Sequence, residues 1–236
     1  MERHELLKET SLLDYRSKGI QTLFAKRGWR DLKEDKKVVS IYNFVRDEIL
    51  FGYNASDSLK ASRILKDGYG QCNTKGILLM ALFRAAGIPC RMHGFTIDKK
   101  LQKGVMTGFV YRVAPREIFH SYVEAYVNGK WYNLEGFILD RKYLSSLQRK
   151  FAPHPDGSFM GYGVATKDFF HPPIDFCFCD TYIQKEGIVR DLGVYDSPDL
   201  LLLEHGQKIG FLKELSFHFV GRRFMNRNVK RIRNLK

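Results

Sequence analysis

The sequence predicts an α+β fold in which a buried helix packs on an antiparallel β-sheet and a helical C-terminal extension follows. Lys33–Tyr53 carries apolar side chains at helical spacing, which indicates an amphipathic helix. Ser121–Val127 and Lys130–Leu134 are short runs rich in Val, Tyr and Trp, as strands usually are. Asn128-Gly129 joins these runs and is the strongest short signal for a hairpin. Helices followed by paired strands are typical of the α+β class.

Two further helices are expected before the sheet. Ala55–Lys66 reads as a helix with Asp57 as its N-cap. The stretch 67–70 (DGYG) then breaks the helix, because glycine allows the chain to turn sharply. The next helix begins near Cys72, is apolar on most sides and ends before Gly87, so we expect it to be buried.

The remaining elements are expected on either side of the hairpin. Ile88–Phe95 follows the buried helix and reads as a strand. Beyond Tyr143 the pattern is less regular, and Ala152–Gly163, rich in Pro and Gly, predicts a long loop. A helix is expected to start at Leu200–Leu203, and another to cover Ile209–Val229.

A length of 236 residues suits one domain with extensions. We assign 1–32 to an N-terminal extension, 33–145 to the core, and 146–236 to a C-terminal extension that completes the domain. Four cysteines at irregular spacing argue against a disulfide scaffold. We see no signal-peptide core at the start and no apolar run long enough to span a bilayer. These features predict a cytoplasmic protein without a transmembrane segment.

The net charge of +13 is unevenly placed, because the tail Arg222–Lys236 carries seven cations and no acidic residue. Such a tail can hold an acidic partner or an anionic surface. It can also be a solvated basic helix that aids solubility. Its aromatics are not interleaved at regular spacing, so no specific nucleic-acid module is indicated.

Cys72 lies where a helix is expected to begin. Unpaired N–H groups and the positive end of the helix dipole favour a thiolate at such a position, and the same N–H groups can stabilise an oxyanion. A free cysteine at the start of a core helix can equally be a small buried hydrophobe. Taken alone, Cys72 favours this structural interpretation.

The hairpin adds a histidine and a carboxylate. If Asn128-Gly129 is a two-residue turn, Val127 faces Lys130, and side chains alternate between the two faces of the sheet. His120 is then the diagonal neighbour of Glu135, within reach of long polar side chains. A carboxylate beside an imidazole orients it and stabilises its protonated form, which in turn can activate a thiol. One face of the hairpin is predicted to carry His120, Tyr122, Glu124, Tyr126, Trp131, Asn133 and Glu135.

With these residues in place, the sequence resembles the transglutaminase-like superfamily of papain-like thiol enzymes. Ala61–Arg91, which contains GYGQC, is similar to the family's nucleophile loop, helix and following strand. His120–Tyr126 and Lys130–Glu135 are similar to its histidine and acid strands. The resemblance covers roughly Lys33–Asp140. It implies a papain/transglutaminase-like core with a Cys-His-acid triad made of Cys72, His120 and Glu135.

The sequence departs from the family pattern at the third member, which is usually Asp and here is Glu135. Asp140 is a weaker candidate for that role, and Asn133 could assist in orienting His120. Tyr69 and Gln71 flank the nucleophile, so either could shape the oxyanion site or the substrate entrance, although both can simply be loop residues.

Other polar residues are weaker candidates for the site. Glu124 shares the face of His120 but lies far along the strand. The remaining histidines, such as His93, have no paired motif. Cys177-Phe178-Cys179 is too short for a zinc knuckle, and no second Cys or His pair is close in sequence. We therefore expect no metal and no cofactor, and no EF-hand spacing suggests calcium.

The resemblance implies acyl chemistry in which Cys72 forms a thioester with an amide, peptide or acyl-thioester substrate. If water resolves the thioester, the protein is a cysteine protease or amidase, which is the interpretation we favour. If an amine resolves it, the protein is an acyltransferase, either a transglutaminase or an amide synthase. A third hypothesis is a non-catalytic binding or scaffold member of the family, and the intact set of Cys72, His120 and Glu135 argues against it.

Overall fold

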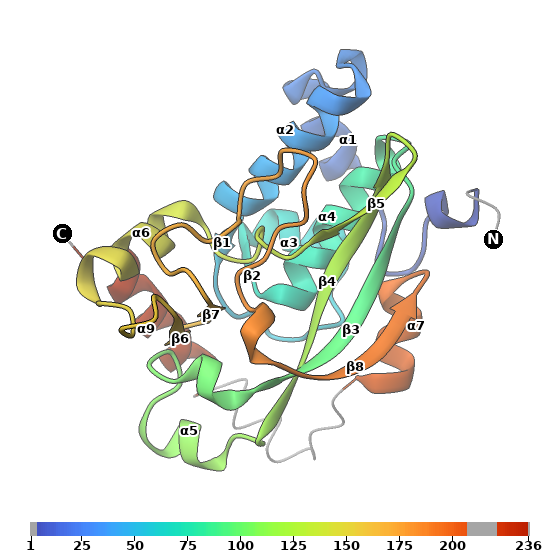
Figure 1. The fold of residues 1–236 in the computed structure, drawn as a ribbon. Helices are drawn as coiled ribbons and strands as arrows, with labels where there is room; N and C mark the ends of the chain where they lie inside the picture. The colour runs from blue at the N-terminus through green and yellow to red at the C-terminus, as the bar shows by residue number, and fades with distance from the viewer. Residues whose placement is uncertain (1–3, 207–220, 236) are drawn as a thin grey trace.

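The computed structural model describes residues 4–206 and 221–235 (Figure 1). Its centre is a four-stranded sheet in the order β5-β4-β3-β8 in which every neighbouring pair is antiparallel. These strands are β3 (Cys90–Asp98), β4 (Glu117–Val127), β5 (Lys130–Leu134) and β8 (Ile188–Tyr195). Helices cover one face of the sheet, with α4 directly behind it in the view of Figure 1. The α+β class predicted from the sequence is confirmed.

Helices precede the strands of the sheet along the chain and also lie between and after them. The α-helices are α1 (Lys18–Arg27), α2 (Glu34–Asp47), α3 (Ala61–Asp67), α4 (Cys72–Ala85), α5 (Gly108–Val113), α6 (Arg141–Lys150), α7 (Pro198–His205) and α9 (Arg222–Arg233). Short 3-10 turns cover Glu5–Leu7, Trp29–Asp31, Lys99–Gln102 and Lys185–Gly187. Two small pairs of strands complete the fold, β1 (Leu50–Phe51) with β2 (Tyr69–Gly70) and β6 (Phe159–Gly161) with β7 (Val164–Thr166).

Helix α4 is the central helix of the core, as its apolar composition predicted. Its side chains from Asn73 to Arg84 are buried. Gly76 lets the helix approach the sheet closely, because a Cβ there would lie 3.0 Å from Met92 Cε on β3 and 3.6 Å from Val123 Cγ2 on β4. Close packing of α4 on these two strands fixes the helix N-terminus, and with it Cys72, relative to the sheet.

The hairpin has the predicted register. Asn128 and Gly129 both have positive φ, 51° and 82°, as a type I′ turn requires. Val127 faces Lys130, and the pairing continues to Val123 opposite Leu134. The alternation of side chains therefore brings the even-numbered residues of β4 to the sheet face away from α4.

Two predicted helix boundaries are wrong. The first helix ends at Asp47 rather than at Tyr53, because Leu50–Phe51 leaves the helical path to pair in parallel with β2. The second begins at Ala61 rather than near Ala55, and Lys60 precedes it, so Asp57 is not an N-cap. Asp57 instead accepts a hydrogen bond from Gln71 Nε2 at 2.8 Å.

The C-terminal part contains more structure than the sequence predicted. The expected loop Ala152–Gly163 includes β6, and α6 and β8 were missed. Strand β8 lies outside the predicted core of 33–145 and still pairs with β3 at the edge of the central sheet. The helix expected over Ile209–Val229 falls partly on residues 207–220, outside the described residues, while its last part belongs to α9.

Helix α9 packs on α6, and the two lie side by side in Figure 1. Arg233 of α9 donates two hydrogen bonds to the carboxylate of Asp140, which is the N-cap of α6, and a third to Phe51 O. Both side chains are buried. Within 4–206 and 221–235, none of the helices is both long and apolar enough to cross a bilayer.

Candidate active site

The loop before α4 holds Cys72 at the first residue of the helix. Gln71 is the N-cap, and it forms a capping box with Thr74 in which each side chain bonds the backbone of the other residue. Gln71 therefore occupies the N–H of Thr74. The N–H groups of Cys72 and Asn73 have no partner within the helix, as is usual for a first turn. A carbonyl oxygen at this position would meet two backbone donors.

His120 and Glu135 meet on the sheet face that the register predicted. His120 Nε2 lies 3.0 Å from Glu135 Oε1, and both side chains have no exposed surface. Nδ1 of His120 is also buried and has no hydrogen-bond partner of ordinary geometry among the described residues. The imidazole is therefore held by the carboxylate through one nitrogen, and the other nitrogen is left for a reactive group.

Cys72 acts on the imidazole through its charge. Burial lowers the pKa of His120, but the charge of Cys72 and the contact with Glu135 outweigh burial and raise the pKa to about 10. Nε2 faces the carboxylate, so Nδ1 is the ring nitrogen left free, while the Cys72 thiol contacts Asn73 Oδ1 at 3.7 Å. Cys72 is partly exposed, whereas His120 and Glu135 are fully buried.

A segment far along the chain holds Glu135 in place. The backbone N–H groups of Ile183 and Gln184 each donate to Glu135 Oε2 at 2.8 Å. Thr181 Oγ1 accepts from the N–H groups of Glu135 and Gly136 at 3.2 and 3.1 Å. One carboxylate oxygen is therefore fixed by backbone donors while the other remains directed at His120, which fixes the orientation of the carboxylate.

The flanking residues predicted for the site have other partners. Gln71 Oε1 accepts from Asn54 N at 2.8 Å, and its Nε2 donates to Asp57, so its amide is occupied within the loop. Asn133 Nδ2 donates to Asp180 and to Tyr182 Oη rather than to His120. The predicted contributions of Gln71 to an oxyanion site and of Asn133 to histidine orientation are therefore corrected. The half-buried Tyr69 lies in β2, where its carbonyl accepts from Asn54.

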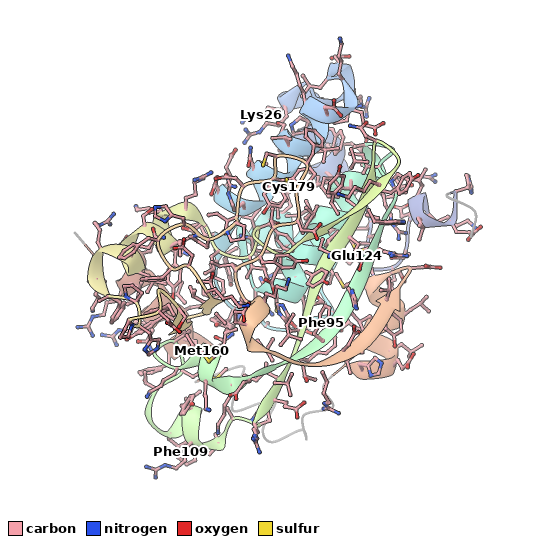
Figure 2. The ribbon with its side chains drawn as sticks, in the orientation of Figure 1. Lys26, Phe95, Phe109, Glu124, Met160 and Cys179 are labelled. Atoms are coloured by element: carbon pink, nitrogen blue, oxygen red, sulfur yellow. The ribbon has the colours of Figure 1, made fainter. Side chains whose placement is uncertain are left out.

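The two other carboxylates considered from the sequence are engaged elsewhere. Asp140, the weaker alternative to Glu135, is bound to Arg233. Glu124 pairs with Arg91 at 2.6 Å and with His93 Nδ1 at 2.8 Å, on the sheet face turned toward the viewer in Figure 2. His93 also contacts Asp191, so it lies in an ion-pair network that its lack of a sequence motif did not indicate.

Two residues near Cys72 were missed by sequence reasoning. Tyr53 is buried and donates to Gln102 Oε1 at 2.5 Å. Burial, Tyr143 and the charge of Cys72 raise the pKa of Tyr53, which places its phenol close to the nucleophile. No motif marks either residue, because the loop of Tyr53 and the 3-10 turn of Gln102 approach each other only in the fold.

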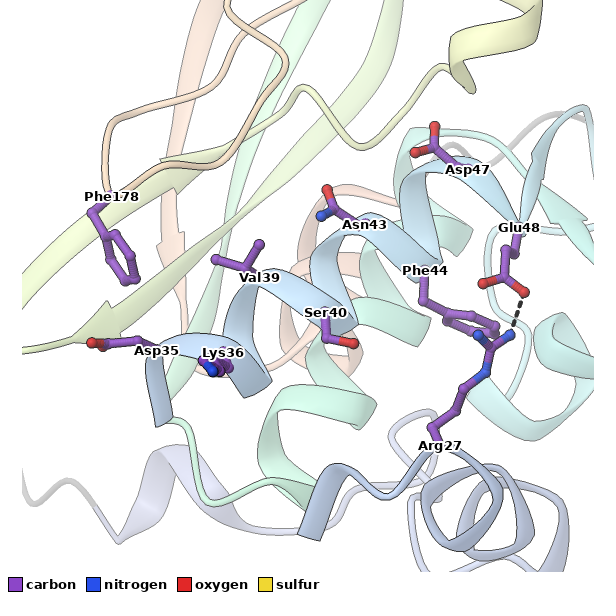
Figure 3. Close-up of a pocket in the computed structure, with 10 residues that line it drawn as sticks. All are labelled: Arg27, Asp35, Lys36, Val39, Ser40, Asn43, Phe44, Asp47, Glu48 and Phe178. Carbon is purple, nitrogen blue, oxygen red and sulfur yellow. Dashed lines mark hydrogen bonds and ion pairs between the residues drawn. The ribbon is translucent and has the colours of Figure 1, made fainter. Parts of the chain in front are cut away.

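A cleft on another part of the molecule does not include this site. It has a volume of about 650 Å³ and lies along the outer side of α2, facing Phe178 (Figure 3). The residues that line it are Arg27, Asp35, Lys36, Val39, Ser40, Asn43, Phe44, Asp47, Glu48 and Phe178, and none belongs to the site around Cys72. Among the described residues, no three His, Cys, Asp or Glu side chains gather as metal ligands. Cys177 and Cys179 are both exposed.

Comparison with known families identifies the segment that carries this arrangement. Residues 23–136 match the model of the transglutaminase-like superfamily, a stretch that includes Cys72, His120 and Glu135. The match covers a little under half of the chain, and this segment is therefore similar to the transglutaminase-like superfamily. The backbone donors of Ile183 and Gln184 lie outside the matched residues.

Two solved structures are similar to part of this chain. One is a candidate cysteine protease from Cytophaga hutchinsonii, with 21% identity and a TM-score of 0.41 over 54% of this chain and 39% of the other. Another is a candidate protease from Parabacteroides distasonis, with 18% identity and a TM-score of 0.36 over 56% of this chain and 26% of the other. The chain thus spans well under half the length of either, and likeness at this level assigns no activity. The search of curated proteins found no match.

Proposed function

We propose that this protein is a thiol hydrolase that cleaves amide bonds through an acyl-thioester on Cys72, as a cysteine protease or amidase does. The observation that carries the proposal is the buried pair of His120 and Glu135, 3.0 Å apart, together with Cys72 at the start of α4, whose charge raises the pKa of His120. This is the arrangement that nucleophilic catalysis by a thiol needs.

The proposed reaction begins with Cys72 as a thiolate and His120 as an imidazolium, the state that the raised pKa of His120 favours. The thiolate attacks the substrate carbonyl carbon, and the N–H groups of Cys72 and Asn73 stabilise the oxyanion that forms. Collapse of this intermediate breaks the C–N bond, and His120 gives its proton to the leaving amine. Water then attacks the thioester with neutral His120 as the base, which releases the acid and restores the thiolate and the imidazolium.

Glu135 acts through His120 in this scheme. Its carboxylate stabilises the imidazolium that exists while the thiolate is present, and it keeps the ring oriented with Nδ1 toward the sulfur. The amide donors of Ile183 and Gln184 keep the carboxylate from turning away. Glu135 is one methylene longer than the Asp that is usual in this family, and these contacts hold the longer side chain in place.

Intact-mass spectrometry after mixing the protein with an activated ester tests the proposal. An acyl group should appear on Cys72 and disappear with time as water hydrolyses the thioester. The Cys72→Ala variant should show no such adduct, and the exposed Cys177 and Cys179 serve as internal controls located by peptide mapping. Stable acylation of Cys72 without turnover would rule out a hydrolase.

The same experiment with an added primary amine separates hydrolysis from transfer. A hydrolase should release mainly the free acid, whereas an acyltransferase should convert most of the acyl group to the amide of the added amine. The measured ratio of acid to amide decides between these outcomes, because both start from the same thioester.

A further inference from the structure

Helices α6 and α9 together present one strongly basic surface, of which the sequence had indicated only the α9 part. The two helices contain no Asp or Glu, and apart from the exposed Phe224 their apolar side chains are buried in the protein. We define the α6–α9 surface by the cations that are exposed on these helices and have no ion-pair partner among residues 4–206 and 221–235. They are Lys142, Arg149, Lys150, Arg223, Arg227, Lys230 and Arg231.

The surface is fixed rigidly to the rest of the fold. Arg233 is buried against Asp140 at the start of α6, and Arg149 donates to the carbonyl of Leu235 just beyond α9. Ser146 Oγ donates to Arg233 O, so backbone and side chains both join the two helices. A basic helix held in this way differs from a solvated tail, because its charges keep one arrangement in space and cannot spread apart to relieve their repulsion.

Helix α9 also lies beside the candidate active site. Asn226 accepts from Tyr53 N at 2.7 Å and donates to Tyr53 O at 2.9 Å. Tyr53 follows β1, which pairs with β2, and β2 ends at Gly70, two residues before Cys72. A macromolecule bound on this surface would extend toward Cys72 without crossing the rest of the protein.

We propose that the α6–α9 surface binds an acidic segment of a polypeptide substrate and directs a neighbouring part of that polypeptide to Cys72. This inference rests on the proposed function. The carboxylates of an acidic polypeptide can pair with the seven cations of the α6–α9 surface. The same polypeptide contains amide carbonyls that the thiol of Cys72 can attack. Helix α9 is about 18 Å long at 1.5 Å per residue, so an extended segment of roughly six residues matches its length.

The surface fits a membrane or a nucleic acid less well. Interfacial helices insert an apolar face into the lipid, but Met225, Val229 and Ile232 of α9 are buried in the protein. Phe224 is the large apolar residue of these two helices that is exposed, at 43%. A nucleic acid would satisfy the cations but carries no amide bond in its backbone for the proposed chemistry.

Fluorescence anisotropy with a labelled oligoglutamate peptide of about ten residues, long enough to span both helices at roughly 3.3 Å per residue, tests this proposal. The full chain should bind it with an affinity that falls steeply with salt, and an oligoglutamine peptide of equal length should not bind. The Arg227→Gln/Lys230→Gln variant should lose about fivefold in affinity, since each exposed contact contributes roughly 0.2–1 kcal/mol and fivefold corresponds to about 1 kcal/mol in all. Thermal unfolding checks that the variant is folded.

The matched control is Lys18→Gln/Lys26→Gln on α1, which removes the same charge from another helix. Lys26 lies on α1 near the top of Figure 2, away from α6 and α9 on the left, and this variant should bind within about twofold of the unchanged protein. Equal losses in the two variants would contradict a specific surface. Tighter binding of single-stranded RNA or of phosphatidylserine vesicles than of the acidic peptide would overturn the assignment of the partner.

Binding and catalysis can fail independently. Anisotropy measures peptide binding to the α6–α9 surface and involves no reaction. Acylation of Cys72 by an activated ester measures the reactivity of the thiol and does not require the α6–α9 surface. If both hold, kcat/KM for an amide attached to an oligoglutamate segment should fall in Arg227→Gln/Lys230→Gln, and kcat/KM for the uncharged amide should stay unchanged. A fall for both amides would contradict a role in substrate binding.

Discussion

His120 Nε2 and Glu135 Oε1 lie 3.0 Å apart in a place where neither side chain is exposed. A carboxylate in such a place is unfavourable unless hydrogen bonds or an opposite charge compensate for its loss of water. Glu135 has both, since Ile183 and Gln184 donate to one oxygen and the imidazole faces the other. The pair is therefore a defined structural unit, and several predictions rest on it.

Replacing Glu135 with Gln should slow the reaction of Cys72 with iodoacetamide by about tenfold or more. The substitution keeps the shape of the side chain but removes the charge that stabilises the imidazolium, and a loss of about 1.4 kcal/mol corresponds to tenfold. The rate is measured by peptide mass spectrometry at neutral pH. The matched control is Glu124→Gln on the same sheet face, which contacts Arg91 and His93 and should leave the rate nearly unchanged.

His120 should stay protonated well above neutral pH in the resting protein. NMR of its ring protons should show a titration near pH 10, and Cys72→Ala should move this titration to lower pH because the charge of Cys72 is the largest cause that raises the pKa. A histidine that titrates near 6.5 in the unchanged protein would contradict the contact with the thiol.

The raised pKa of His120 also links stability to pH. Its folded-state value lies above the unfolded value of about 6.5, so its contribution is complete below that pH and is lost as pH rises toward 10. The free energy of unfolding of the unchanged protein, relative to His120→Gln, should therefore decrease between pH 7 and about 10. Burial lowers the pKa of Lys75 to about 7, so the contribution of Lys75 to the free energy of unfolding increases over the same pH range. The difference between the unchanged protein and His120→Gln removes this contribution, because Lys75 is present in both.

Thr181→Ala should weaken both folding and reactivity. The hydroxyl accepts from the N–H groups of Glu135 and Gly136 and from Tyr42 Oη, so its loss leaves buried donors unsatisfied at a cost of about 1–3 kcal/mol. Denaturant unfolding measures the first effect and iodoacetamide labelling of Cys72 the second. The control is Thr166→Ala, which removes another buried hydroxyl. This hydroxyl donates to Asp168 O and not to Glu135, so its loss should affect stability and leave the labelling of Cys72 unchanged.

Arg233→Met should destabilise the protein by about 3–5 kcal/mol, because it leaves the carboxylate of Asp140 buried without its partner. The double variant Asp140→Asn/Arg233→Met should recover part of this loss, since the uncompensated charge is gone. Urea unfolding of the two variants provides the test. If Arg233→Met were as stable as the unchanged protein, α9 would not be an integral part of the fold.

The parts of the site that local sequence specifies were predictable. The Asn128-Gly129 turn fixes the register of β4 and β5 as far as Val123 opposite Leu134, and His120 and Glu135 lie just beyond that last pair. The glycine-containing loop and the apolar helix after it place Cys72 at the first residue of α4. In each case a short pattern determines backbone geometry, and the side-chain positions follow.

The supporting contacts were not predictable, because they join segments that share no local pattern. Ile183 and Gln184 lie 48 and 49 residues beyond Glu135 and act through backbone N–H groups, which every residue but proline possesses. The amide of Gln71 could have faced the substrate or the loop, and only the positions of Asn54 and Asp57 decide between them. The basic surface likewise needed the packing of α9 on α6, two helices far apart in sequence.

Acylation of Cys72 tests the central claim most directly. The protein is mixed with an activated acetyl ester, quenched in acid within the first turnover, and mapped by peptide mass spectrometry. We predict an acetyl group on Cys72 at a much higher level than on the exposed Cys177 and Cys179, and a loss of this difference in His120→Ala. Equal labelling of all three cysteines, unchanged in His120→Ala, would show that His120 and Glu135 do not activate Cys72.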